Sequence, residues 1–317
     1  MGRTPVSVIK AVDVAFVRFA VPDMAKQRAF LKDFGMVEVG EVDGTLYLRG
    51  AGKAPFCYAL SEGDPAFLGF GVWAKDRADL DAIAAHDGVA IEPLTSPGGG
   101  FRARLTDPDG ICVDVVAGQT MSAPIAAPAP LSWNEGSGRL SRLSTFRRTP
   151  AGPSKVQRLG HVVLSVSDFR SSEAWYKERL GLLTSDEVQP APGIAIGAFM
   201  RADRGEEPTD HHMIVCFQPG GPAGHMHSAF EVVGVDDLMA GHDHLAAAGY
   251  TPQWGVGRHI LGSQIFDYWL DPFGNEIEHW TDGDQLRASD GGGVASMDIV
   301  LGVQWGMRMP SPPEMAG

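Results

Sequence analysis

Three residues in the second half of the chain, His161, His227 and Glu278, have side chains of the types that hold a divalent metal ion. Two neutral imidazoles and one carboxylate suit Fe(II) and leave open positions on one face of the ion for substrate and O2. Zn(II), Mn(II) or Ni(II) could bind to the same residues. Histidine is also unevenly distributed, because His86 is the only one of the ten histidines that precedes residue 160. We therefore expect one metal site, in the second half.

A weak internal repeat shows how these residues could meet. Residues 14–23, followed by a helical pattern that ends near Gly35, match residues 159–168, followed by one that ends at Gly181. Each segment ends in an aspartate suited to cap a helix, and each glycine is suited to end one. In the second half, His161 and His227 begin the first strand of two successive units. The repeat would therefore bring them to equivalent places on one wall of a barrel.

The end of each half repeats as well. Residues 105–110 and residues 270–274 both contain an Asp-Pro-x-Gly sequence, which favours a type I turn. An apolar strand that ends in an acid, Asp114 or Glu278, follows each turn. The first half has the acid but not the imidazoles.

At the positions of the two imidazoles, the first half has phenylalanines. Phe16 stands for His161 and, by a looser alignment, Phe67 stands for His227. One acid without imidazoles does not make this kind of site, so we expect the first half to be structural.

The order strand, helix, several strands occurs twice in each half and predicts an α+β fold of two domains, each of two βαβββ modules curled into an open barrel. We place the first domain at 1–120, a linker rich in Ala, Pro and Ser at 121–157, the second domain at 158–285 and a tail at 286–317. The tail is expected to pack through Ile299, Leu301 and Trp305.

In the second half, residue patterns predict individual elements. Helices are expected at 169–180 and at 235–248, with Asp236 as the cap of the second. Strands are expected near 158–166, 183–188, 195–200, 211–217, 227–233, 264–270 and 275–281.

Composition excludes several classes of partner. The net charge of −13 disfavours nucleic acid, and no stretch of 18 apolar residues suggests a membrane span. No signal peptide is recognisable. The three cysteines, Cys57, Cys112 and Cys216, are scattered in apolar surroundings and resemble reduced core residues. We expect a cytoplasmic protein without nucleic-acid or membrane partners.

The segment 257–278 resembles the signature of the type I extradiol catechol dioxygenases of the vicinal oxygen chelate superfamily. It contains His259, a tyrosine nine residues later (Tyr268), an Asp-Pro-x-Gly turn and then Glu278. The resemblance covers about residues 10–285 and is specific only in the second half. Asp267 replaces the apolar residue that the family has before its tyrosine.

The resemblance implies roles for six residues. His161, His227 and Glu278 would be the ligands of Fe(2+). His212, fifteen residues before His227, would be the acid/base residue, while His259 and Tyr268 would contact a substrate hydroxyl and assist the later steps. Met226 stands where the family has a histidine next to its second ligand.

The family chemistry explains these residue types. A base such as an imidazole must take a proton from the catechol, and hydrogen-bond donors must stabilise oxygen atoms whose charge changes. The resemblance implies a substituted catechol and O2 as substrates and a ring-opened semialdehyde as product. We also expect a homo-oligomer.

Other polar residues are expected to have ordinary roles. His242 and His244 lie two residues apart on a predicted helix and are expected to be solvated, and His279 should point away from Glu278 by strand alternation. His211 and His225 are expected at the surface or behind the site. Glu276 shares a face with Glu278 and is the rival carboxylate.

Three other functions remain open from the residues. A metal isomerase, epimerase or thiol transferase of the glyoxalase kind needs the ligands but not His212, His259 and Tyr268 together. A hydroxyphenylpyruvate-type dioxygenase uses the same kind of ligand set. A drug-binding or scaffold protein on the same barrels would need no metal ligands. An apolar substrate pocket is suggested by Phe199, Met200, Phe217, Ile265 and Phe266.

Overall fold

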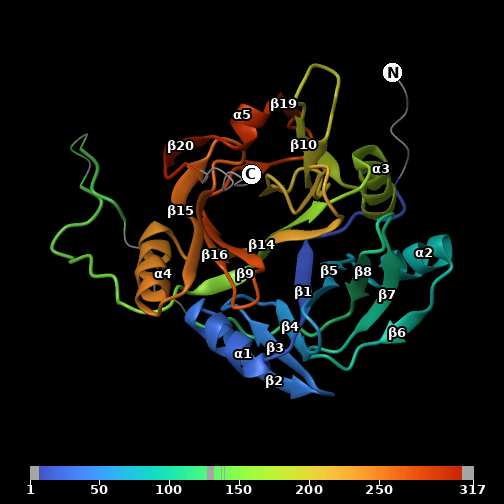
Figure 1. The fold of residues 1–317 in the computed structure, drawn as a ribbon, viewed down its shortest axis with the longest axis horizontal. Coiled ribbons are helices and arrows are strands. Elements are labelled where there is room, and N and C mark those ends of the chain that lie inside the picture. Colours follow the sequence, from blue (N-terminus) through green and yellow to red (C-terminus); the bar gives the residue numbers. More distant parts are fainter. Residues whose placement is uncertain (1–6, 127–131, 137, 139, 309–317) are drawn as a thin grey trace, which may run out of the picture.

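The computed structural model describes residues 7–126, 132–136, 138 and 140–308. The described strands form two large sheets, one from each half of the chain. Figure 1 shows the first half in blue to teal and the second in yellow to red, with the green connection extending away from both. This is the mixed α+β architecture that the residue pattern predicts.

The first sheet has the strand order β2-β3-β4-β1-β5-β8-β7-β6. Its strands are β1 (Val14–Val21), β2 (Val37–Val42), β3 (Thr45–Arg49), β4 (Tyr58–Glu62), β5 (Ala66–Trp73), β6 (Ile91–Pro93), β7 (Phe101–Thr106) and β8 (Cys112–Ala117). Two helices accompany it, α1 (Met24–Asp33) and α2 (Arg77–Asp87).

The second sheet has the order β19-β10-β11-β13-β9-β14-β17-β16-β15-β20. Its strands are β9 (Val156–Ser165), β10 (Leu183–Val188), β11 (Gly197–Arg201), β13 (Ile214–Phe217), β14 (Gly224–Val232), β15 (Thr251–His259), β16 (Ile265–Leu270), β17 (Glu276–Thr281), β19 (Gly293–Ala295) and β20 (Val303–Gly306). Its helices are α3 (Phe169–Leu180), α4 (Val235–Ala247) and the short α5 (Met297–Val300), while β12 (Thr209–Asp210) and β18 (Gln285–Leu286) pair separately.

Local signals fix the ends of the first helix in each half. The Asp23 side chain accepts a hydrogen bond from the Lys26 amide, and Asp168 accepts one from the Ser171 amide. Gly181 ends α3 with a φ of 69°, in the left-handed region that glycine adopts easily. The predicted bounds of α3 and β10 agree with the structure.

The predicted cap of α4 is wrong. Gly234 occupies the N-cap position of α4 and makes no side-chain cap bond, while Asp236 lies inside the first turn and forms an ion pair with Arg147 of the connecting segment. An acid in the first turn still interacts favourably with the helix dipole, so the residue type fits although its position differs.

The tail does not pack as predicted. Ile299, Leu301 and Trp305 remain 38%, 45% and 46% exposed. The tail instead adds β19 beside β10 and β20 beside β15, at the two edges of the second sheet. Residues 296–302 therefore connect the two edges of this sheet.

The two halves contact each other reciprocally. Asp107, in the turn before β8, accepts a hydrogen bond from Tyr176 of α3 at 2.9 Å. Asp271, in the equivalent turn before β17, accepts one from Gln27 of α1 at 2.8 Å. Each half thus holds the turn of the other, and one continuous apolar core includes residues of both. Among the described residues, no helix is long and apolar enough to cross a membrane.

Candidate functional site

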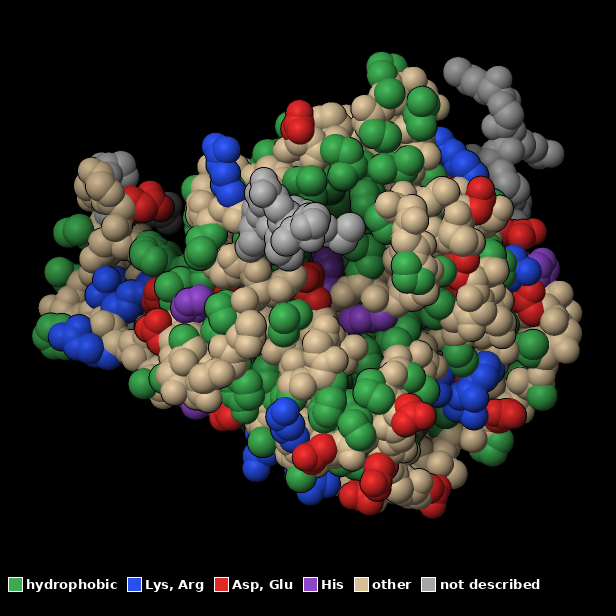
Figure 2. Space-filling model, viewed as in Figure 1, with side chains coloured by type: hydrophobic (Ala, Val, Ile, Leu, Met, Phe, Trp, Pro, Cys, Tyr) green, Lys and Arg blue, Asp and Glu red, His purple; other side chains and the backbone are tan. Residues whose placement is uncertain are grey.

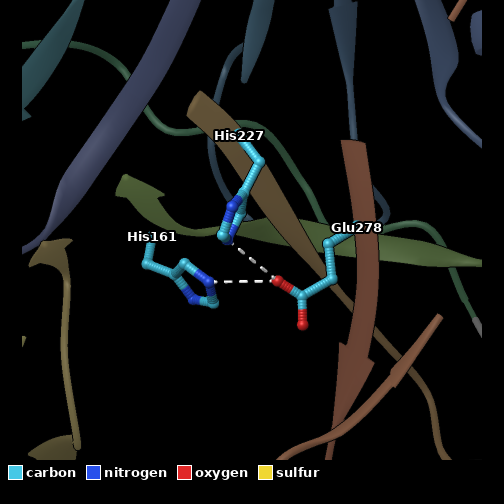
Figure 3. Close-up of side chains that lie close together, drawn as sticks. All are labelled: His161, His227 and Glu278. Atoms are coloured by element: carbon cyan, nitrogen blue, oxygen red, sulfur yellow. Dashed lines mark hydrogen bonds and ion pairs between the residues drawn. The ribbon is translucent and has the colours of Figure 1, made fainter. Parts of the chain in front are cut away.

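His161, His227 and Glu278 come together on three adjacent strands, β9, β14 and β17. His161 Nε2 lies 3.2 Å and His227 Nε2 lies 3.4 Å from the same atom, Glu278 Oε2, as Figure 3 shows. Ala229 of β14 is the register partner of both His161 and Glu278, which places those two residues at one level of the sheet, on the two strands that flank β14. One ligand atom from each residue lies within 4.8 Å of the others.

The protonation states suit a cation. Burial lowers the pKa of His161, although the Glu278 carboxylate opposes the shift, so the imidazole is kept neutral. Burial by itself would raise the pKa of Glu278, but His161 and His227 outweigh it, and the pKa lies below the usual range of a carboxyl group. Two neutral imidazoles beside a carboxylate are the donor set of many divalent metal sites.

Several polar atoms at this place lack partners. His227 Nε2 and Glu278 Oε1 are buried and have no hydrogen-bond partner within the described part of the chain. A buried polar atom without a partner costs free energy, which makes such atoms uncommon in folded proteins. A bound cation would satisfy both atoms, so the residues fit a divalent metal.

Glu276 lies behind His227 and does not join the set of three. Its Oε1 atom is 3.5 Å from Nδ1 of His227, the ring nitrogen that faces away from Glu278. Carboxylates in this position fix the orientation of a metal-binding histidine and make it a better donor. The geometry therefore gives Glu276 a supporting role.

His212 lies beside the triad. Its ring centroid is 4.2 Å from that of His161, and it lines the same cavity. Burial lowers the pKa of His212 well below its usual value, and the neighbouring histidines add to the effect. The imidazole is therefore neutral at physiological pH and has a lone pair that can accept a proton.

His259 and Tyr268 form a hydrogen-bonded pair on β15 and β16, with 3.0 Å between Nε2 and the phenol oxygen. Burial, together with Glu278 and Glu276, raises the pKa of Tyr268 well above its usual value, so the phenol keeps its proton. Burial lowers the pKa of His259 to about 4. Tyr268 can therefore donate one hydrogen bond.

A cavity of about 150 Å³ contains these groups. Its volume suits a small ligand, because sites for drug-sized molecules usually measure roughly 300–1,000 Å³. Figure 2 shows histidine and acidic side chains in a depression near the middle of the molecule, bordered by hydrophobic side chains. The apolar lining residues are Val163, Phe199, Val215, Phe217, Met226, Trp254, Leu261 and Val300.

Of the residues predicted to make the pocket apolar, Phe199 and Phe217 line the cavity, whereas Met200, Ile265 and Phe266 do not. Sequence reasoning missed Trp254, because its strand was not predicted, and Val300, because no local pattern marks it. Most of the lining residues come from β9, β11, β13, β14, β15, β16 and β17, so the second sheet curls around the cavity, and Val300 of α5 adds to the lining.

Comparison with known proteins adds independent evidence. Residues 158–279 match the Glyoxalase/Bleomycin resistance protein/Dioxygenase superfamily. The chain is 31% identical over 299 residues to metapyrocatechase 2 of Cupriavidus necator, covering 92% of this chain and 87% of that protein. The chain belongs to the extradiol dioxygenase family of this superfamily. An iron-dependent extradiol dioxygenase of Rhodococcus jostii is 25% identical, covering 86% of this chain and 90% of that protein.

The fold of this chain, the vicinal oxygen chelate fold, is similar to that of solved structures. The 2,3-dioxygenase LapB from Pseudomonas sp. KL28 has a TM-score of 0.76 at 19% identity and covers 92% of this chain and 99% of that chain. The Mn(II)-bound glyoxalase from Novosphingobium aromaticivorans also has a TM-score of 0.76, at 22% identity, and covers 96% of this chain and 95% of that chain. At such identities the likeness concerns the fold alone.

In this member of the extradiol dioxygenase family, the first half has other residues at the place that corresponds to the His-His-Glu triad of the second half. Gly71 is the register partner of Phe16 and Asp114, just as Ala229 is the partner of His161 and Glu278. Phe16 therefore corresponds to His161, as predicted. The predicted equivalence of Phe67 with His227 is wrong, because the residue two positions before Gly71 is Gly69.

Arginines neutralise the acid in the first half. Asp114 is fully buried, and Arg104, Arg18 and Arg102 approach its carboxylate to 2.9, 3.4 and 3.8 Å. The ring of Phe16 stacks on Phe56 with 4.7 Å between centroids and occupies the place of an imidazole. These cations and rings stand where the second half has its His-His-Glu triad and cavity.

The remaining histidines differ in how well they were predicted. His279 points away from Glu278, as expected, and its Nε2 atom donates to the Phe34 carbonyl at 2.7 Å. His242 and His244 are not simply solvated. They are partly buried and bond to Asp267 at 3.0 Å and Asp33 at 2.9 Å, because α4 packs against β16 and α1.

His211 is buried and His225 is partly buried. His225 Nε2 lies 2.7 Å from Ser228 Oγ, and the His225 ring packs against Phe19 and Phe67 of the first half. His211 lies directly behind His212, and their Nδ1 atoms are 3.0 Å apart. Of the two places expected for these residues, the surface and the space behind the site, His211 occupies the second.

Proposed function

We propose that the protein is an Fe(II)-dependent dioxygenase that opens the ring of a substituted catechol next to the diol, with both atoms of O2 entering a ring-opened semialdehyde. One observation carries the proposal. His161 and His227, two members of the His-His-Glu triad, line the same small cavity as His212, His259 and Tyr268. Membership of the extradiol dioxygenase family and the iron-dependent relative support it.

His161, His227 and Glu278 would hold the iron. The chemistry that Fe(II) supplies when bound is Lewis-acid binding of the diol and electron transfer to O2. Glu276 would keep the ring of His227 in place through its Nδ1 atom. Because Glu278 is buried and ionised, the triad brings one negative charge to the cation and removes the cost of two unpartnered polar atoms.

His212 would act as the base. A catechol in the cavity must lose a proton from one hydroxyl to become electron-rich, and a neutral imidazole on the cavity wall can take it. The imidazolium formed would return the proton to an oxygen atom later in the reaction.

Tyr268 and His259 would act on the oxygen atoms on the other side of the cavity. The phenol of Tyr268 keeps its proton and can turn from His259 to a substrate oxygen that gains negative charge. The ring of Trp254 stacks on Tyr268 with 5.4 Å between centroids and restricts its movement.

The lining of the cavity limits the substituent on the catechol. None of the residues that line it, all of them in the described part of the chain, is Lys or Arg. A carboxylate on the substituent would lose its hydration without gaining a cation, which costs several kcal/mol. An uncharged substrate with an apolar substituent therefore fits best.

Oxygen uptake and product spectra with freshly reconstituted Fe(II) protein test the proposal. We expect 3-methylcatechol to be converted to a yellow semialdehyde with one O2 consumed per ring, and a catechol with a carboxylate side chain to react much more slowly. Labelled O2 should place both atoms in the product. A muconic diacid as the main product, or conversion of a glyoxalase-type substrate without O2, would contradict the assignment.

A further inference from the structure

Two residues behind His212 form a hydrogen-bonded chain with it. Asp186 of β10 lies at its start, with its Oδ2 atom 2.7 Å from Nε2 of His211. The other ring nitrogen of His211, Nδ1, lies 3.0 Å from Nδ1 of His212. His211 and His212 are both buried, and Asp186 is partly buried.

The chain determines which nitrogen of each ring carries a proton. The Asp186 carboxylate can only accept a hydrogen bond, so the proton of a neutral His211 lies on Nε2. His211 Nδ1 then offers a lone pair, and the short contact to His212 Nδ1 requires a proton on the latter atom. The lone pair of a neutral His212 therefore lies on Nε2.

We propose that Asp186 and His211 are positioning residues that hold His212 in the tautomer with its proton on Nδ1, so that Nε2 is free to accept the substrate proton. The proposal rests on the proposed function of His212 as the base. When the proton moves from a catechol hydroxyl to Nε2, the Nδ1 proton stays in its hydrogen bond to His211. No proton has to leave the chain.

The surroundings keep His211 in this orientation. The Ser185 hydroxyl donates to the His211 carbonyl at 2.6 Å, and the buried Arg201 donates to the Ser185 hydroxyl at 2.9 Å. Gly262 lies against the His211 ring, where an added Cβ would be 3.1 Å from Nδ1. A ring held by its backbone and by a close neighbour can fix the tautomer of the next ring.

The tail takes part in holding Asp186. Gly293 of β19 is its register partner, and an added Cβ at Gly293 would lie 2.2 Å from Asp186 Oδ1. The strand that the tail adds to the sheet therefore packs directly on the carboxylate that begins the chain. Through this contact the tail is connected to His212, although the two are distant in sequence.

A matched pair of variants tests the role of the acceptor on His211. In His211→Asn, the side-chain oxygen can occupy the place of Nδ1, whereas His211→Leu has similar size but no acceptor. Both lose the contact to Asp186, so they differ in the hydrogen bond to His212. We expect kcat on the best catechol to fall roughly 10–100-fold in His211→Leu, as for other residues that orient an active-site group. His211→Asn should recover most of this loss.

KM and iron content should stay near those of the unmodified protein in both variants. Wild-type kcat in His211→Leu, or equal loss of kcat in both variants, would overturn the proposal. A loss of iron in His211→Leu would also overturn it, because His211 would then support the metal site.

Nitrogen NMR of the metal-free protein with labelled histidine reads the tautomer directly and does not depend on turnover. The His212 signals can be assigned by their absence in His212→Phe. We expect a protonated Nδ1 and an unprotonated Nε2, and a mixture of tautomers in Asp186→Leu. A proton on Nε2 in the unmodified protein would refute the proposal even if the enzyme cleaves catechols. Absence of catechol cleavage would instead refute the proposed function and leave this measurement decisive for the tautomer.

Discussion

Asp114 and Glu278 occupy equivalent positions in the two halves, and replacing each by alanine should have opposite consequences. In Glu278→Ala the proposed metal site loses the carboxylate of its His-His-Glu triad. Mutation of a residue that only orients a metal ligand typically lowers metal affinity roughly 10–100-fold. Loss of the ligand itself should lower the affinity by more than this. We expect Glu278→Ala to be purified without iron and Asp114→Ala to keep one iron per chain.

The effect on stability can be estimated from the same two sites. At a free iron concentration of about 100 times the dissociation constant, binding stabilises the folded protein by roughly 2.7 kcal/mol. For a domain of about 150 residues, each kcal/mol shifts the Tm by roughly 2–4 °C, so a chelator should lower the Tm of the unmodified protein by about 5–11 °C. The same chelator should leave the Tm of Glu278→Ala unchanged.

Asp114→Ala should instead destabilise the protein in the presence of iron. Removing the carboxylate leaves Arg18, Arg102 and Arg104 around a buried gap, and breaking a buried ion pair costs about 3–5 kcal/mol. The Arg104 side chain is 42% exposed and can turn to water, so the lower end of this range is expected.

Metal analysis and thermal unfolding with and without chelator measure both effects. The reasoning is refuted if Asp114→Ala loses iron, if the unmodified protein holds two ions per chain, or if Glu278→Ala keeps its iron. The last result would make Glu276 the ligand.

Four further variants test other parts of the structure. His212→Phe should keep iron and bind catechol while kcat falls roughly 10²–10⁴-fold, as expected for loss of a general base, and near wild-type turnover would exclude that role. His259→Phe and Tyr268→Phe should each cost less kcat than His212→Phe, and larger losses would show that one of them moves the essential proton. His242→Leu should destabilise the protein without changing kcat, because it leaves the buried Asp267 carboxylate without its imidazole partner. The hydrogen bond to Asp267 raises the pKa of His242, so its contribution is fully present below the ordinary pKa of about 6.5 and is lost as pH rises through the higher folded value. Urea unfolding at pH 6 and pH 9 should show a larger deficit at pH 6, and an equal deficit would contradict this account.

In the second half, sequence patterns predicted an element best where the residues that begin and end it lie within the element or next to it. α3 begins at a capping aspartate and ends at a glycine with positive φ, and both ends were predicted. The strand β15 was not predicted, because Pro252, Gly255 and Gly257 suggest a loop. In the structure Gly255 has a φ of 85° at an irregularity of the strand, and Gly257 leaves room for the ring of Phe266. Packing between strands, which is invisible in a local pattern, explains these glycines.

The three residues of the proposed metal site could be predicted because their types and order follow a family signature. The residues behind the site, Asp186 and His211, could not be predicted in this way. Asp186 of β10 reaches His212 through His211, and both histidines lie in the segment between β12 and β13, about 26 residues further along the chain. Gly293 of the tail packs against Asp186. Such contacts depend on the register of β10 and β19, which the sequence does not reveal.

The two halves show that one scaffold position can hold a buried carboxylate in two ways. Tyr268 is the register partner of Glu278, and Arg104 is the partner of Asp114. In the first half an arginine at this position neutralises the acid within the chain, and the ring of Phe16 occupies the place of His161. In the second half the partner is an uncharged phenol, so the carboxylate keeps its charge for a cation. The buried acid alone therefore does not identify a metal site, and the charge of the residue across the strand pair distinguishes the first half from the half that we propose to be catalytic.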